Sequence, residues 1–197
     1  MAGFNISTFQ TKLAGGGARP NLFQVRLTAY PAAVVAGSRP ASSDFSFMCK
    51  AVSGLPSSTI GTIDVPYFGR LVRYAGDREF AEITTTVIND EDYKIRNMTD
   101  NWMNGINGAS SNKPRTGVTA ASSTFTATME IDTFKKSGVL DQTYSFKNCW
   151  PSNVSTIDLN WDSVNTIQEF TITWQYNYFE HDNAFISSAT DEDAGDW

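Results

Sequence analysis

The last regular stretch of the chain alternates strictly between apolar and polar side chains. Within the range 166–180, every second residue from Phe170 to Tyr178 is apolar, and the residues between them are polar. A period of two predicts a β-strand with one apolar face, so we expect Phe170, Ile172 and Trp174 to point into the core. At about 3.3 Å per residue, a strand over this whole range would span about 50 Å. That length exceeds what one small domain covers, which indicates a strand shared between subunits.

Alternating or β-prone segments recur along the rest of the chain. In one of them, the pattern places Phe45 and Phe47 on the same face as Cys49. In another, Gly76-Asp77 gives a turn signal between two strands. The segments predict further strands over the ranges 22–28, 44–55, 58–65, 67–74, 80–88, 124–134 and 143–148.

The pattern changes to a helical period after residue 88. An Asn-Asp pair at 89–90 provides an N-cap, and acidic side chains follow it near the positive end of the helix. Ile95, Met98 and Trp102 recur at helical spacing. We therefore expect a helix over 90–104 with these three side chains on its buried face.

Together, these elements predict an all-β protein with one flanking α-helix, organised as an antiparallel β-sandwich or barrel over residues 21–180. Residues 1–20 are rich in Gly and Ala and predict a flexible N-terminal arm, while residues 181–197 form an acidic tail. The range 107–118 is a polar loop with Gly and Pro. We expect the arm and this loop to become ordered only in an assembly.

Composition and charge narrow the classes of function. The chain of 197 residues is 41% hydrophobic and 13% aromatic, which suits one strand-rich domain. A net charge of −6 lacks the basic footprint of a conventional nucleic-acid binder. No apolar run approaches about 18 residues, so no membrane segment is expected, and the N-terminus lacks the pattern of a secretory signal. Cys49 and Cys149 are expected to be buried free thiols rather than a disulfide or part of a zinc site.

The sequence offers little catalytic chemistry. It contains no nucleophile elbow, zinc-protease motif or phosphate-binding loop. His181, the only histidine, follows the last strand among acidic residues and is interpreted as an exposed surface residue. The carboxylates of Asp90, Glu91 and Asp92 could supply a glycosidase pair, but helix capping explains them. We predict no enzyme and no catalytic, metal or cofactor site. A carbohydrate-binding sandwich with an aromatic platform stays open as an alternative.

Two blocks of the sequence resemble the tail tube proteins of contractile-tailed bacteriophages. The first spans 65–107 and reads VPYFGRLVRYAGDREFAEITTTVINDEDYKIRNMTDNWMNGIN. The second spans 148–180 and reads NCWPSNVSTIDLNWDSVNTIQEFTITWQYNYFE. The resemblance covers roughly residues 40–180, and the first 40 residues and the acidic tail match less clearly.

The resemblance implies a structural virion protein. In that family, six copies form a ring whose inner strands join in one β-barrel, and stacked rings form a hollow tube related in fold to the type VI secretion tube. The sheath drives the tube through the host envelope, and DNA passes through the lumen without specific binding. The implied partners are other copies of the chain, the tail sheath protein, and the baseplate and tail terminator proteins. The implied location is the virion tail, after assembly in the host cytoplasm, with no cofactor. A tube-initiating baseplate protein or the tube of a phage-derived injection machine is the alternative within this fold.

Charged residues near the centre of the chain are candidates for subunit contacts. Charges of both signs on a hairpin form surface or interface pairs more often than a catalytic centre. Six copies of a chain with net charge −6 carry −36 in total. We therefore expect Arg70, Arg73 and Arg78 to be occupied in pairs with acidic neighbours or in subunit contacts. We also expect the lumen to be acidic or neutral, so that DNA slides. The candidate interface residues are Arg70, Arg73, Asp77, Arg78, Lys94 and Arg96.

Overall fold

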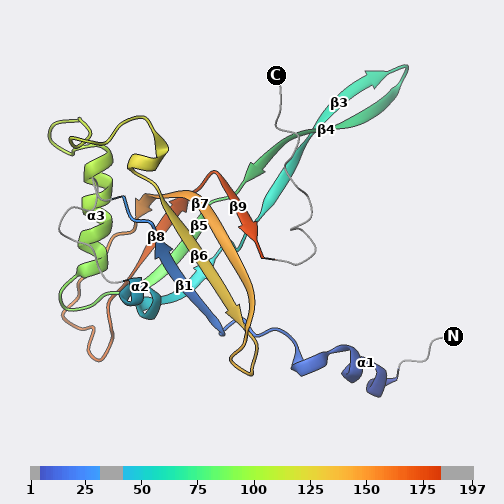
Figure 1. Ribbon diagram of the computed structural model, residues 1–197, viewed down its shortest axis with the longest axis horizontal. Coiled ribbons are helices and arrows are strands. Elements are labelled where there is room, and N and C mark those ends of the chain that lie inside the picture. The colour runs from blue at the N-terminus through green and yellow to red at the C-terminus, as the bar shows by residue number, and fades with distance from the viewer. Residues whose placement is uncertain (1–4, 32–41, 183–197) are drawn as a thin grey trace.

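The computed structural model describes residues 5–31 and 42–182 and shows a sandwich built from one antiparallel sheet (Figure 1). The predicted acidic tail lies outside the described residues beyond Asp182. Seven strands make up the sheet, and β9 joins it by pairing with β7. In spatial order the strands are β1 (Phe23–Thr28), β6 (Ala127–Phe134), β7 (Leu140–Val154), β8 (Glu169–Gln175), β5 (Ile83–Ile88) and β2 (Cys49–Ser53), with β9 (Tyr178–His181) on β7.

Strand β7 links the two halves of the sheet. Its first part pairs with β6 and β9, and its last part pairs with β8. Asn148, with a left-handed φ of 54°, lies where the partners change, and the register with β6 shifts beside it. Such irregularities bend a strand. One core cluster contains side chains from both halves, so the bend closes the sheet into a sandwich. The prediction of a short strand over 143–148 is therefore too short, because β7 has 15 residues.

The single long strand predicted over 166–180 is wrong. It consists of β8 and β9, which are separated by Tyr176 and Asn177, and β9 pairs with β7 rather than extending β8. The length of that strand was the reason to expect sharing between subunits, so this expectation loses its support. The facing of β8 is confirmed, because Phe170, Ile172 and Trp174 are all buried.

Trp174 lies at the centre of the core. Its indole N–H donates to Thr85 Oγ1 at 2.9 Å, so the polar atoms of both buried side chains are satisfied. Its ring packs edge-to-face on Trp102 at 5.8 Å and on Phe45 at 6.1 Å between centroids. These contacts join the sheet to two helices, because Trp102 lies on α3 (Lys94–Ile106) and Phe45 on α2 (Ser42–Met48).

Helix α3 flanks the sandwich, as predicted. Ile95, Met98 and Trp102 are buried on one face. The helix begins at Lys94, four residues after the predicted start, because the chain first turns through Tyr93 in the left-handed region (φ 53°). The side chain of Asp90 still caps the first turn, since its Oδ1 accepts a hydrogen bond from the backbone N–H of Lys94 at 3.0 Å.

Two further helices were not predicted. Helix α1 (Ile6–Lys12) lies in the predicted flexible arm, with its described side chains exposed. Helix α2 replaces the first part of the strand predicted over 44–55. Phe45 is buried, whereas Phe47 is 80% exposed, so the predicted common face is wrong. Cys49, which begins β2 directly after this helix, is buried as well.

Both cysteines are free and buried, as predicted. Burial raises the pKa of the Cys49 thiol to about 12, although the hydrogen bond to the backbone of Ala51 lowers the pKa in part. Burial also raises the pKa of the Cys149 thiol, well above its usual range. In the folded protein both groups therefore stay protonated at pH values where free thiols ionise.

We expect the protein to lose stability in alkaline solution. Unfolded thiols ionise near their ordinary pKa of about 8.5, and folded Cys49 ionises only near 12, so proton loss favours the unfolded state. The thiol contribution is complete below the unfolded pKa and is lost as the pH rises towards the folded pKa. Urea unfolding from pH 7 to 10.5 measures it. Cys149→Ala, although less stable at pH 7, is expected to show a smaller further loss above pH 9. An equal loss in both proteins would contradict this role of the thiol.

Candidate assembly surface

A long two-stranded hairpin projects away from the sandwich (Figure 1). It consists of β3 (Ser58–Tyr67) and β4 (Arg70–Phe80), which pair antiparallel as a separate sheet. At its base, the Phe80 ring packs on Phe179 at 5.7 Å between centroids. Every residue of β3 is exposed in the described chain. An isolated two-stranded hairpin is marginal in water, so this one needs another surface to cover it.

The hairpin turns at Phe68-Gly69, not at the predicted Gly76-Asp77. Both turn residues have positive φ, 43° and 77°, as a two-residue type I′ turn requires. Gly76 and Asp77 lie within β4, opposite a register shift in β3. A Cβ on Gly76 would lie 3.1 Å from the carbonyl oxygen of Gly61. The glycine signal therefore marks a close backbone approach at a bulge rather than a turn.

One face of the hairpin is apolar. Ile63 lies opposite Tyr74, and Val65 lies opposite Val72, so these four side chains share one side of the ribbon. All four are exposed, and Phe68 at the tip is 92% exposed. Contiguous exposed apolar side chains of this kind mark interaction surfaces. We call the set Ile63, Val65, Val72 and Tyr74 the apolar hairpin face.

Four of the six charged candidates lie on this hairpin. On the face opposite the apolar hairpin face, Arg73 Nε lies 3.4 Å from Asp64 Oδ1. Arg78 donates to Ser58 Oγ at 3.2 Å, and its guanidinium lies 5.1 Å from the centre of the Phe80 ring. Arg70 is next to the turn and Asp77 is at the bulge. The face that carries the Asp64–Arg73 pair also carries the exposed Leu71, whereas Arg70 lies on the side of the apolar hairpin face.

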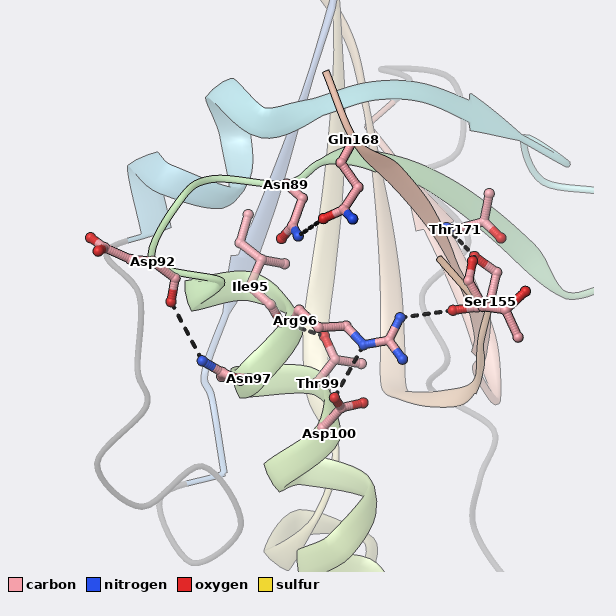
Figure 2. Close-up of polar contacts among 11 residues, drawn as sticks. Asn89, Asp92, Ile95, Arg96, Asn97, Thr99, Asp100, Ser155, Gln168 and Thr171 are labelled. Carbon is pink, nitrogen blue, oxygen red and sulfur yellow. Dashed lines mark hydrogen bonds and ion pairs between the residues drawn. The ribbon is translucent and has the colours of Figure 1, made fainter. Parts of the chain in front are cut away.

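The other two candidates, Lys94 and Arg96, lie in the first turn of α3. Figure 2 shows Arg96 and its contacts. Lys94 is exposed, and its hydrogen bond and ion pair with Asp92, 3.1 Å away, raise its pKa. Arg96 makes its contacts within the subunit. Its Nη1 donates to the carbonyl oxygen of Ser155 at 2.7 Å, and its Nε donates to Asp100 Oδ2 at 3.1 Å. Its guanidinium also lies 5.4 Å from the centre of the Phe170 ring.

We expect Arg96→Ala to lower the free energy of unfolding by about 1–3 kcal/mol, because it removes a charge-assisted hydrogen bond to a backbone carbonyl and a cation–π contact. Urea denaturation measures the loss. Lys94→Ala is the matched control, since Lys94 is exposed and close by, and its unfolding midpoint is expected to stay near that of the parent. Equal effects of the two substitutions would refute the structural role of Arg96.

The same network anchors a long loop between β7 and β8. Ser155 Oγ accepts from the backbone N–H of Thr171 at 2.9 Å, and Asn89 Nδ2 donates to Gln168 Oε1 at 2.6 Å (Figure 2). The loop they anchor, 156–168, exposes several large apolar side chains to solvent. These are Leu159, Trp161, Val164 and Ile167, which we call the apolar loop cluster.

The apolar loop cluster and the hairpin lie at opposite ends of the molecule. The loop connects β7 to β8 beside the lower end of α3, whereas the hairpin extends beyond the other end of the sheet (Figure 1). Two different exposed apolar surfaces, far apart on one subunit, suit head-to-tail contacts, which build rings or open stacks. Sequence reasoning found the charged candidates but missed both apolar surfaces, because an alternating pattern does not say what covers its apolar face.

His181, the only histidine of the sequence, belongs to neither the hairpin nor the apolar loop cluster. His181 on β9 is half-buried rather than exposed, with Nδ1 3.3 Å from Gln142 Nε2 and its ring 6.0 Å from that of Tyr144. The prediction of an exposed histidine is therefore wrong.

Over residues 5–31 and 42–182, no three His, Cys, Asp or Glu side chains gather as metal ligands would. Among the described helices, none combines the length and the apolar character needed to cross a membrane.

Comparison with known proteins gives one consistent family. The family model for the phage tail tube protein matches residues 18–182. The tail tube protein gp19 of Enterobacteria phage T4 is 32% identical over 177 residues, covering 85% of this chain and 93% of the relative. The tail tube protein of Serratia phage KSP90 is 23% identical over 172 residues, covering 87% and 93%. These matches confirm the family resemblance of the two sequence blocks.

Solved structures support the fold. A chain of the anti-feeding prophage baseplate has a TM-score of 0.59 at 14% identity, covering 83% of this chain and 94% of that one. A chain of the sheath–tube complex of an extracellular contractile injection system has a TM-score of 0.55 at 16% identity, covering 91% and 98%. At these identities the likeness shows a shared fold.

Proposed function

Because the chain belongs to the phage tail tube protein family, we propose that six copies form a ring and that stacked rings build the inner tube of a contractile tail. The family match spans the hairpin, α3 and the whole sheet, so the chain has a structural rather than an enzymatic function. The observation that carries the assembly proposal is the apolar hairpin face, which has no cover within the described subunit. Family membership also favours a tube over a carbohydrate-binding module.

Open strand edges and exposed apolar surfaces support contacts between copies. Strands β1 and β2 are the two ends of the strand order, and each pairs on one side only among the described residues. If β1 of one copy paired with β2 of the next, the strands would close a barrel across the ring and leave no open edge. The hairpin and the apolar loop cluster at the opposite end then supply head-to-tail contacts. The exposed helix α1 and the charged candidates on the hairpin belong to the same proposed interfaces.

We further propose that the tube contacts a tail sheath, a baseplate and a terminator, and that it assembles in the host cytoplasm. Membership of the tail tube family supports these partners and the location in the virion tail. A tube-initiating baseplate protein has the same fold, so the fold does not separate the two roles. Copy number does: quantitative mass spectrometry of purified particles should give many sets of six copies. Six copies per particle would assign the initiator role instead.

We expect assembled tubes not to bind duplex DNA measurably at about 150 mM salt, where weak phosphate contacts are screened. The chain has 15 Lys and Arg against 21 Asp and Glu, and Arg73 is paired with Asp64. We propose that no ring of unpaired cations faces the lumen, so the wall does not hold the phosphates and DNA passes. A gel-shift assay measures this, with a basic DNA-binding protein as positive control. A clear shift by tubes at this salt would overturn the proposal of an acidic or neutral lumen.

A further inference from the structure

The sandwich has two outer faces that point away from each other. One core cluster lies between the two halves of the sheet and takes alternate residues from each strand. On β5 and β8 the core takes Val87 and Ile172, among others, and on β6 it takes Met129 and Ile131. The residues between these positions lie on the outer faces, and the two faces differ in charge.

One outer face carries small, uncharged side chains. Directly opposite residues share a face of a sheet. Ser53 on β2 lies opposite Thr84 on β5, and Thr84 lies opposite Thr173 on β8. Thr173 in turn lies opposite Asn153 on β7, so the row crosses four strands. With the neighbouring Thr86–Thr171 pair, these side chains form what we call the neutral face: Ser53, Thr84, Thr86, Asn153, Thr171 and Thr173.

The charged side chains at the margins of the neutral face have partners. At one margin, Lys50 Nζ lies 2.6 Å from Glu169 Oε1. At the other, Glu82 Oε2 accepts a hydrogen bond from Gln175 Nε2 at 3.0 Å. All six residues of the neutral face are exposed or half-buried in the described subunit. This face therefore presents hydroxyl and amide groups to solvent rather than charge.

The opposite outer face has a row of the same length but of different chemistry. Arg26 on β1 lies opposite Glu130 on β6, Glu130 lies opposite Ser145 on β7, and Ser145 lies opposite Glu180 on β9. Arg26 Nη2 forms ion pairs with Glu130 at 3.1 Å and Asp132 at 2.7 Å, and its side chain is still 42% exposed. Lys147 pairs with Glu180 at 3.3 Å. We call this the charged face: Arg26, Glu130, Asp132, Lys147 and Glu180.

We propose that the neutral face lines the lumen of the tube, where duplex DNA is the partner that it faces. This inference rests on the proposed ring and tube and names the surface that forms the wall. Each phosphate that a Lys or Arg neutralises adds affinity through counterion release, whereas a hydroxyl releases no counterion. Small side chains also keep the channel wide. The neutral face extends to β2, an open edge of the sheet, so it reaches the contact between neighbouring copies. The charged face then points away from the lumen.

Cysteine labelling of assembled tubes tests this assignment. Thr173→Cys places a thiol on the neutral face, and Ser145→Cys is the matched variant at a half-buried position within the charged face. Cys49 and Cys149 are buried, so the parent itself should label little. In dissociated subunits, both introduced thiols should react with a polyethylene-glycol maleimide that is too large to enter the tube. On assembly, we expect labelling of Thr173→Cys to fall by about an order of magnitude and that of Ser145→Cys to stay nearly unchanged.

A small maleimide separates the lumen from a subunit interface. It should still label Thr173→Cys in tubes, because it diffuses along the lumen. Labelling of this variant by the large reagent in tubes, or protection of it from both reagents, would overturn the proposal. The proposal would also fail if Ser145→Cys were the variant that reacts with the small reagent alone.

Thr84→Cys, directly opposite on β5, gives the same reading if Thr173→Cys does not assemble. Electron micrographs of the same samples are taken before labelling. A parent protein that forms no tubes is thereby recognised as a failure of the proposed function, which removes the lumen and overturns this inference as well. Tubes with the wrong labelling pattern overturn the inference alone.

Discussion

Replacing Trp174 by alanine is expected to lower the free energy of unfolding by about 3–5 kcal/mol, the range for removing a large buried aromatic side chain. The substitution empties the centre of the core, where the indole contacts Trp102 and Phe45. It also removes the indole N–H that Thr85 Oγ1 accepts, at a threonine that is fully buried. Urea denaturation of the dissociated subunit measures the loss.

Trp161→Ala is the matched control for this substitution. Trp161 belongs to the apolar loop cluster and is fully exposed, so its removal should change the free energy of unfolding by less than about 0.5 kcal/mol. The two variants lose the same side chain from opposite environments. A loss below about 1 kcal/mol for Trp174→Ala would contradict the core described here, because it falls well under the range for such sites.

The second large effect concerns assembly rather than folding. We expect Val65→Asp with Val72→Asp to raise the concentration needed for assembly at least about 100-fold, which corresponds to about 2.7 kcal/mol. Both side chains lie on the apolar hairpin face, so two carboxylates there would have to be buried without partners. The subunit itself should stay folded, since the hairpin extends away from the core (Figure 1). Sedimentation velocity over a concentration series measures the change.

The opposite face of the same hairpin supplies the control. Thr62 and Ala75 lie opposite one another on the side that carries the Asp64–Arg73 pair. Thr62→Asp with Ala75→Asp adds the same charge to the same two strands and is expected to weaken assembly much less. If the Val65 and Val72 variant assembles at the parent concentration, the apolar hairpin face is not an interface.

The sequence predicted the fold class and the facing of most core residues because those features follow from side-chain periodicity. Phe170, Ile172 and Trp174 on β8, and Ile95, Met98 and Trp102 on α3, are buried as expected. Element boundaries were less accurate. The sequence alternates through Tyr178, but the strand breaks at Tyr176 and Asn177, and in β9 Phe179 packs on the core while Tyr178 is exposed. Phe45 and Phe47 fit a period of two, but α2 buries only one of them.

For the candidate assembly surface, the sequence predicted the charged residues but not the apolar hairpin face. Arg70, Arg73, Asp77 and Arg78 all lie on the hairpin, yet the sequence placed a turn at Gly76-Asp77, where the structure has a bulge. The apolar hairpin face has the same alternation as a core strand. Whether such a face meets its own core or another subunit depends on the tertiary arrangement, which periodicity does not encode.

Electron microscopy of the purified protein, without nucleotide, metal or cofactor, tests the central claim most directly. The account predicts rings with six-fold symmetry that stack into hollow tubes, and class averages should show both the symmetry and the lumen. Monomers alone at high concentration, or closed assemblies that never stack, would contradict it.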